Sequence, residues 1–179
     1  MNLRINRLGA GEWILGSASI LLLIDLFGLS WFAYRPQFHA TAVMLGQAPS
    51  ANGWQSFEVI GPLTLLVCLT GAAVWLLTAT RRSPALPAVI TTLLLPVSLV
   101  LAVLVAVRVL LDGPAVHLAQ ADGRNVITAQ PGAYIGLLLS FVLFIGAFMG
   151  MRREGVAPED APRVIETVRV GQASDAGRA

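Results

Sequence analysis

The stretch from Phe57 to Leu111 decides the fold; it reads FEVIGPLTLLVCLTGAAVWLLTATRRSPALPAVITTLLLPVSLVLAVLVAVRVLL. It holds two apolar blocks, about residues 57–80 and 85–111, which only Arg-Arg-Ser-Pro at residues 81–84 separates. Each block can cross a bilayer core about 30 Å thick, which takes about 20 helical residues. Because the polar break is so short, the two helices must run antiparallel, with both adjoining ends at one membrane face. The stretch therefore predicts a transmembrane helical hairpin.

Two further apolar stretches lie outside the hairpin, from about Trp13 to Tyr34 and from about Gly132 to Met151. The first is longer than a signal-peptide core of about 7–15 residues, so we count it as a span. The second follows Pro131, whose missing N–H does no harm in the first turn of a helix. Four spans predict an all-α membrane protein, an up-down bundle of four transmembrane helices.

The composition is that of a chain that lies in lipid. Of its 179 residues, 56% are apolar and 12% are charged, whereas ordinary soluble domains have about 45–50% and about 25%. The net charge is only +2 and is spread over the loops, so the sequence has no basic stripe that would bind nucleic acid. No lysine occurs, while Ala, Leu and Arg are abundant. This indicates a GC-rich bacterial genome and, with the spans, a multi-pass protein of the bacterial inner membrane.

Arginines near the span ends predict the orientation, because positively charged loops stay on the cytoplasmic side. Both termini are expected in the cytoplasm: residues 1–12 as a short N-terminal segment and residues 152–179 as a disordered tail. Within the tail, residues 163–170 are rich in β-branched side chains and are the part that would order on a partner. One face collects Arg4, Arg7, Arg81, Arg82, Arg152 and Arg153, and the other collects Arg35, Arg108 and Arg124.

The fourth span carries glycines at helical spacing. Gly132 with Gly136, and Gly146 with Gly150, form two G-x-x-x-G patterns, and at about 100° per residue all four lie along one stripe. Helices in lipid associate through close contact at such small residues. The stripe is either a pairing face towards a second copy or another protein, or a face for packing within the chain, which we favour.

The second span has a comparable face of small residues at Gly61, Thr64, Cys68 and Gly71. We expect this face to receive the fourth span. Cys68 is the only cysteine, so no disulfide forms within the chain, and we interpret the thiol as a small buried apolar group. In the third span, Pro96 cannot donate a backbone hydrogen bond. We expect a local bend there, either a hinge or, as we favour, a fixed shape.

Asp25 stands within the first predicted span, about 12 residues beyond Trp13. Near the bilayer centre an ionised Asp costs about 2.5–3.5 kcal/mol. We therefore expect it to face inward, on a helix face that Gly28 borders, and to find a polar partner. The open alternatives are an Arg108–Asp25 pair, an Arg108–Glu58 pair, or an Arg108 that reaches to the interface. Asp25 is either a proton-relay or ion-coupling acid or, as we favour, a structural polar residue.

Candidate metal ligands are few. His39 and His117 lie in the outer loops, the latter near Asp112 and Asp122, but without the spacing of a metal site. No histidine lies inside a span to hold haem, and no G-x-S-x-G pattern indicates a serine hydrolase. We therefore predict no metal, no cofactor and no enzymatic activity.

Five short motifs are distributed over roughly residues 12–155: LSWF at 29–32, GWQSF at 53–57, VRVLL at 107–111, GAYIGL at 132–137 and RREG at 152–155. Together they resemble a group of uncharacterised four-span integral membrane proteins of actinobacterial type. The resemblance implies four spans and a role for the arginine at position 108. It implies no activity.

The favoured function follows from the glycine-rich helix faces. We expect a small integral membrane protein whose role is association through these faces, with itself or with a larger membrane complex. The alternative is a small transporter or channel subunit that uses the intramembrane acid Asp25. Replacing Asp25 with Asn separates the two, since an association protein should keep its assembly whereas an ion-coupled carrier should lose transport.

Overall fold

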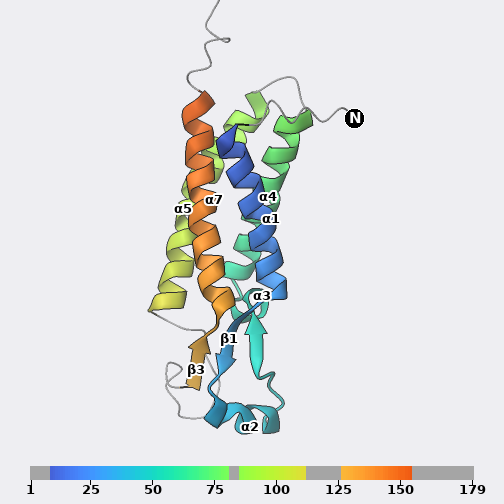
Figure 1. The fold of residues 1–179 in the computed structure, drawn as a ribbon, viewed down its shortest axis with the longest axis vertical. Helices are drawn as coiled ribbons and strands as arrows, with labels where there is room; N and C mark the ends of the chain where they lie inside the picture. The colour runs from blue at the N-terminus through green and yellow to red at the C-terminus, as the bar shows by residue number, and fades with distance from the viewer. Residues whose placement is uncertain (1–8, 81–84, 112–125, 155–179) are drawn as a thin grey trace, which may run out of the picture.

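The computed structural model describes residues 9–80, 85–111 and 126–154. Four long helices run alternately down and up in sequence order (Figure 1), and each is long and apolar enough to cross a membrane. Helix α1 packs against α4 and α7, and α5 packs against the same two helices, so the four form a ring. The predicted up-down bundle of four helices is confirmed. The bounds are Ala10–Gly28 for α1, Ile60–Thr80 for α4, Ala85–Leu110 for α5 and Pro131–Glu154 for α7.

The prediction that the first span ends at Tyr34 is wrong. Helix α1 ends at Gly28, and strand β1 then covers Ser30–Tyr34. The backbone is already extended at Leu29, with φ −103° and ψ 147°. The residues of β1 are mostly aromatic, and aromatic side chains suit a strand as well as a hydrophobic span. At the other three spans the observed ends differ from the predicted ones by three residues or fewer.

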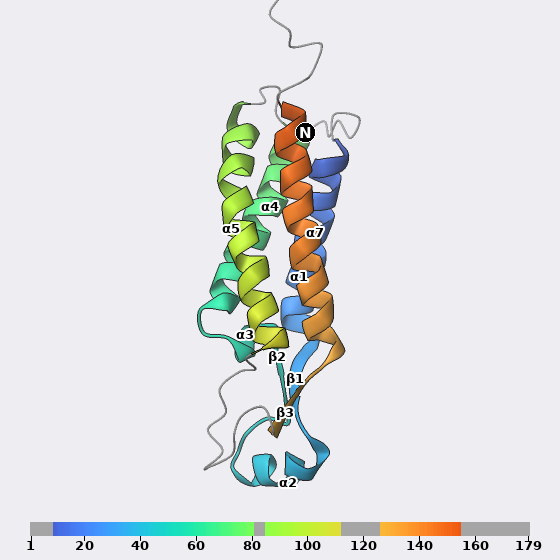
Figure 2. The same cartoon turned by 90° about the vertical axis from the view of Figure 1, so that its left-hand side faces the viewer.

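Beyond one end of the bundle lies a small antiparallel sheet, which we did not expect from the sequence (Figures 1 and 2). Its central strand is β1, flanked by β2 (Ser50–Asn52) and β3 (Ile127–Ala129). Helix α2 (Pro36–Met44) lies at the far tip of this sheet. We call β1, α2, β2 and β3 together the sheet domain. The short helix α3 (Gly53–Ser56) leads from β2 back to α4.

The sheet domain is joined closely to the bundle. One residue separates α1 from β1, one separates β3 from α7, and α3 follows β2 directly. Backbone hydrogen bonds reinforce these junctions: Gln130 N–H donates to the Trp31 carbonyl at 2.8 Å, and Arg35 N–H donates to the Val126 carbonyl at 2.9 Å. Strands that continue straight from helices have little freedom to swing, so the bundle sets the position of the sheet domain.

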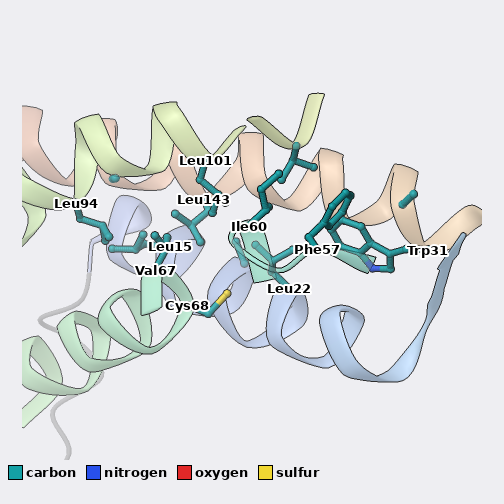
Figure 3. Close-up of a cluster of buried hydrophobic side chains, with 14 of the residues drawn as sticks. Leu15, Leu22, Trp31, Phe57, Ile60, Val67, Cys68, Leu94, Leu101 and Leu143 are labelled. Carbon is teal, nitrogen blue, oxygen red and sulfur yellow. The ribbon is translucent and has the colours of Figure 1, made fainter. Parts of the chain in front are cut away.

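The bundle interior is filled by apolar side chains from every helix, as Figure 3 shows for Leu15, Val67, Leu101 and Leu143. The outward faces are apolar as well. A helix that is hydrophobic all round belongs in the core of a large protein or in a membrane, and these outward faces have no protein over them. Large exposed apolar side chains occur on all four helices, among them Ile24, Leu66, Leu93 and Leu138.

Several predictions concern residues outside the described ranges. They are the cytoplasmic placement of residues 1–8, the hairpin break at 81–84, the outer loop at 112–125 with its His117, and the tail at 155–179.

Candidate functional site

Asp25 lies in the last turn of α1, three residues before the helix ends at Gly28. At about 1.5 Å per residue, its backbone is about 5 Å from that end and about 22 Å from the other. Asp25 therefore lies near one end of the bundle, and not near its middle as the apolar sequence predicted. The side chain does face inward, being 2% exposed.

The Asp25 carboxyl group has no hydrogen-bond partner on either oxygen among the residues that the structure describes. The predicted hydrogen-bonded pair with Arg108 is therefore not formed. The reason is topological: Arg108 is on α5, which lies diagonally across the ring from α1. Glu58 is exposed just before α4 begins. The other two alternatives for Arg108 stay predictions.

The indole of Trp31 closes the bundle end next to Asp25. The side chain is fully buried, at 0% exposed, although it belongs to a strand. Its Nε1 donates a long hydrogen bond of 3.4 Å to the backbone carbonyl of Asp25. Phe57 packs edge-on against this indole with ring centres 6.1 Å apart, and Phe32 packs edge-on against Phe57 at 5.6 Å. Figure 3 shows Trp31 and Phe57 together at one end of the core.

Two glycines make room for this tryptophan. A Cβ built on Gly136 of α7 would lie 2.2 Å from Cζ2 of Trp31 and 2.7 Å from Oδ2 of Asp25. A Cβ built on Gly53 of α3 would lie 2.7 Å from Cε2 of Trp31. Real Cβ atoms do not approach other atoms so closely. The surface of α7 at Gly136, which we call the Gly136 notch, therefore holds both the indole and the carboxyl group.

The remaining glycines of the α7 stripe also face other parts of the chain, namely β1, α1 and α5. A Cβ on Gly132 would lie 2.6 Å from the Ser30 carbonyl oxygen, and a Cβ on Gly146 would lie 2.6 Å from the backbone nitrogen of Leu15. From the opposite side, a Cβ on Gly11 would lie 2.5 Å from the backbone nitrogen of Gly150. The stripe therefore serves packing within the chain, which is the alternative that we favoured.

The small-residue face of α4 packs against α1 and not against α7, so that prediction is wrong. A Cβ on Gly71 would lie 2.2 Å from Oγ of Ser19 on α1. Gly61 instead faces the backbone of Trp54, at 3.3 Å. The expected packing role of Gly28 is also wrong, because the residue is exposed and a Cβ there would meet only its own helix, at 4.0 Å. Periodicity identifies a face of a helix but not the neighbour that covers it.

Four other buried polar side chains of the bundle bond to their own helix, whereas Nε1 of Trp75 is buried without a hydrogen-bond partner among the described residues. The hydroxyls of Ser19, Thr64 and Ser140 each donate at 2.7 Å to a carbonyl three or four residues earlier in the same helix. Ser98 does the same at 2.8 Å, two residues after Pro96, which α5 accommodates without a break. A hinge at Pro96 stays a prediction. The carboxyl group of Asp25 has no such local acceptor or donor.

Two titratable side chains near the tip of the sheet domain hydrogen-bond to residues close to them in the sequence. Tyr34 donates its hydroxyl proton to Oε1 of Gln47, and Nε2 of His39 donates to the Tyr34 carbonyl at 2.6 Å. Burial raises the pKa of Tyr34. Within the described residues no three His, Cys, Asp or Glu side chains gather where they could hold a metal. Cys68 is a buried free thiol, as expected.

Comparison with family models, with curated proteins and with solved structures finds no match to this chain. The resemblance stated from the short motifs therefore stays a prediction. Sequence reasoning missed the roles of Trp31, Gly53 and Phe57 at the site, because it assigned Trp31 and Phe57 to two predicted spans and gave Gly53 no role. The available signal was the bulky rings beside a span end in both LSWF and GWQSF, with a glycine next to the ring in GWQSF.

Proposed function

We propose that this chain is a multi-pass protein of a bacterial cell membrane, with both termini in the cytoplasm and the sheet domain outside. We propose a non-catalytic role for it, as an association or accessory component. The apolar outward faces of the four helices support the location in lipid. The excess of arginine at the end of the bundle opposite the sheet domain supports the orientation.

The surface that we propose for association is the tip of the sheet domain. The glycine faces of α1, α4 and α7 already hold the chain's own helices together, so they are not free for a partner. At the end of α2, Val43, Met44 and Leu45 are 61%, 86% and 57% exposed. Contiguous apolar side chains on a water-facing surface mark sites of protein interaction. This exposed apolar tip is the observation that carries the proposal.

The tip lies far from the lipid-facing part of the bundle (Figures 1 and 2). With strands that rise about 3.3 Å per residue, the five residues of β1 alone place α2 about 16 Å beyond the end of α1. The chain's own bilayer is therefore not what covers the tip. We propose a second protein at the same height above the membrane, either another copy of this chain or a different membrane protein.

The single native cysteine allows a clean test. Cys68 is 1% exposed in the bundle, so a Met44→Cys variant carries one accessible thiol. We expect a membrane-impermeant maleimide to label Met44→Cys in intact cells and to leave the unsubstituted chain unlabelled. A thiol-reactive crosslinker at this position should then join the chain to a copy of itself or to one discrete protein.

A second substitution tests whether the crosslink arises from specific contact at the tip or from random collisions between proteins in the membrane. Leu45→Asp in the Met44→Cys background should abolish the crosslink while leaving expression and labelling unchanged, because a charge disrupts an apolar contact. Thr128→Asp, on an exposed residue of β3, should leave the crosslink intact. No crosslink, or one that survives Leu45→Asp, would contradict association through the tip. Labelling only after the cells are opened would contradict the orientation.

A second candidate function rests on Asp25. Its burial without a hydrogen-bond partner is what a small transporter or channel subunit with an intramembrane acid would show. Asp25→Asn should then abolish ion-coupled uptake into vesicles that contain the chain, while the crosslink from Met44→Cys persists. An association protein keeps both its crosslink and its cellular phenotype with this substitution.

A further inference from the structure

We propose that the Asp25 carboxyl group is a proton-binding site and that its ionisation releases Trp31 from the end of the bundle. This goes beyond the association role and does not depend on it. The first support is burial: the side chain is 2% exposed and neither carboxyl oxygen has a hydrogen-bond partner among the described residues. An isolated carboxylate is expensive in such surroundings, whereas the neutral carboxyl group is tolerated. The site therefore favours a bound proton.

The second support is the lack of space for any larger cation. The Gly136 notch is filled, because even a methyl group at Gly136 would lie within 2.7 Å of both the Trp31 ring and Oδ2 of Asp25. A metal ion needs several oxygen ligands at about 2.0–2.6 Å around a cavity of its own size. A proton needs no cavity. Among cations, the proton fits this site.

Among the described residues, no charged side chain hydrogen-bonds to the carboxyl group in place of the proton. Helix α3 and strand β2 carry no titratable side chain, and the charged end of α7 lies about 16 residues, or about 24 Å, from Gly136. None of the other titratable groups on elements around Asp25 hydrogen-bonds to its carboxyl group. Those groups are Glu12 at the far end of α1, Tyr34 on β1, Glu58 before α4, Cys68 on α4, Arg108 on α5 and Tyr134 on α7.

The link from Asp25 to the sheet domain is Trp31. Its indole shares the Gly136 notch with the carboxyl group, and its Nε1 donates to the backbone carbonyl of the same residue, Asp25. When the carboxyl group ionises, it must gain water, and the buried Trp31 ring beside it occupies the space that this water needs. Trp31 lies in the central strand, between β2 and β3. Its displacement therefore moves the junction that positions the sheet domain.

The test uses the fluorescence of Trp31 alone. The full chain carrying Trp13→Phe, Trp54→Phe and Trp75→Phe is reconstituted in lipid nanodiscs, and the emission of the remaining tryptophan is followed as the pH is raised from about 4 to about 9. We expect a reversible shift of the emission maximum to longer wavelength as the ring meets water. With Asp25→Asn added, the maximum should stay at the short, buried wavelength at every pH. An emission maximum that does not move, or one that moves equally with Asp25→Asn, overturns the proposal.

An infrared measurement keeps the test decisive if Asp25→Asn does not fold. In the unsubstituted chain, the carbonyl stretch of a protonated, buried carboxyl group should disappear with the same pH midpoint as the Trp31 shift. The absence of such a band, or two different midpoints, overturns the proposal. Crosslinking through Met44→Cys is measured separately, so failure of the association role and failure of the proton site are distinguishable.

Discussion

The substitution Gly136→Ala tests the notch that holds Trp31 and Asp25. The new methyl group would lie 2.2 and 2.6 Å from two ring carbons of Trp31 and 2.7 Å from Oδ2 of Asp25. Overpacking of a filled core costs about 1–3 kcal/mol, and the upper end applies because both neighbours are fully buried. The higher helix propensity of Ala returns about 1 kcal/mol. We therefore expect a net loss of about 2 kcal/mol.

The assay is thermal unfolding in a mild detergent, followed by near-ultraviolet circular dichroism, which reports the packing of aromatic rings. A loss of about 2 kcal/mol lowers the midpoint by about 4–8 °C for a chain of this size. Gly28→Ala is the matched control, because its Cβ would meet only its own helix at 4.0 Å. We expect a change within about 1 kcal/mol there. Equal unfolding midpoints for the two variants would refute the claim that Gly136 packs directly against Trp31 and Asp25.

Three further predictions concern the sheet domain and its junction with the bundle. Trp31→Ala empties a fully buried site and should cost about 3–5 kcal/mol, visible as a large drop of the same midpoint. Asn52→Ala removes the cap on the Gln55 N–H and the bond to the Phe27 carbonyl; we expect a loss of about 1–2 kcal/mol and faster hydrogen exchange at the start of α3. Burial raises the pKa of Tyr34 above 10.0, so its contribution to stability should be complete below that pH and fall as the pH rises through the higher folded value. Ultraviolet absorbance of tyrosinate should show this late transition, and Tyr34→Phe should remove it.

Hydropathy identified the four helices but not where α1 ends. Length and apolar content are sufficient to find a span, because a helix in lipid must satisfy its backbone internally. They do not separate a helix from a buried strand when the residues are aromatic, as they are from Ser30 to Tyr34. The error moved Asp25 towards the middle of the predicted span, whereas the structure places it in the last turn. The sheet was missed for a second reason as well, since its outer strands have only three residues each and show no periodicity.

The glycine stripe of α7 could be predicted because its spacing is a property of one helix. Which helix covers the stripe is a property of the assembled bundle, and sequence spacing does not contain it. Gly61 and Gly71 show the limit: both were expected to face α7, yet one faces α3 and the other faces α1. The Gly136 notch shows the same limit at the candidate site, because the side chain that fills it comes from a strand 105 positions earlier in the chain, at residue 31.

The position of Asp25 near a helix end changes what the residue can do. At the centre of a bilayer a carboxyl group exchanges protons only through a relay of other groups, and among the described residues no side chain hydrogen-bonds to the Asp25 carboxyl group. Asp25 instead lies about 5 Å from the end of α1, where the Trp31 ring that shares its space is the group that the proposed release would replace with water. That ring belongs to Trp31, the second residue of the strand on which the sheet domain is built. Under the proposed proton-binding role, Asp25 would let the position of the sheet domain follow the pH at that end of the bundle, without carrying an ion across.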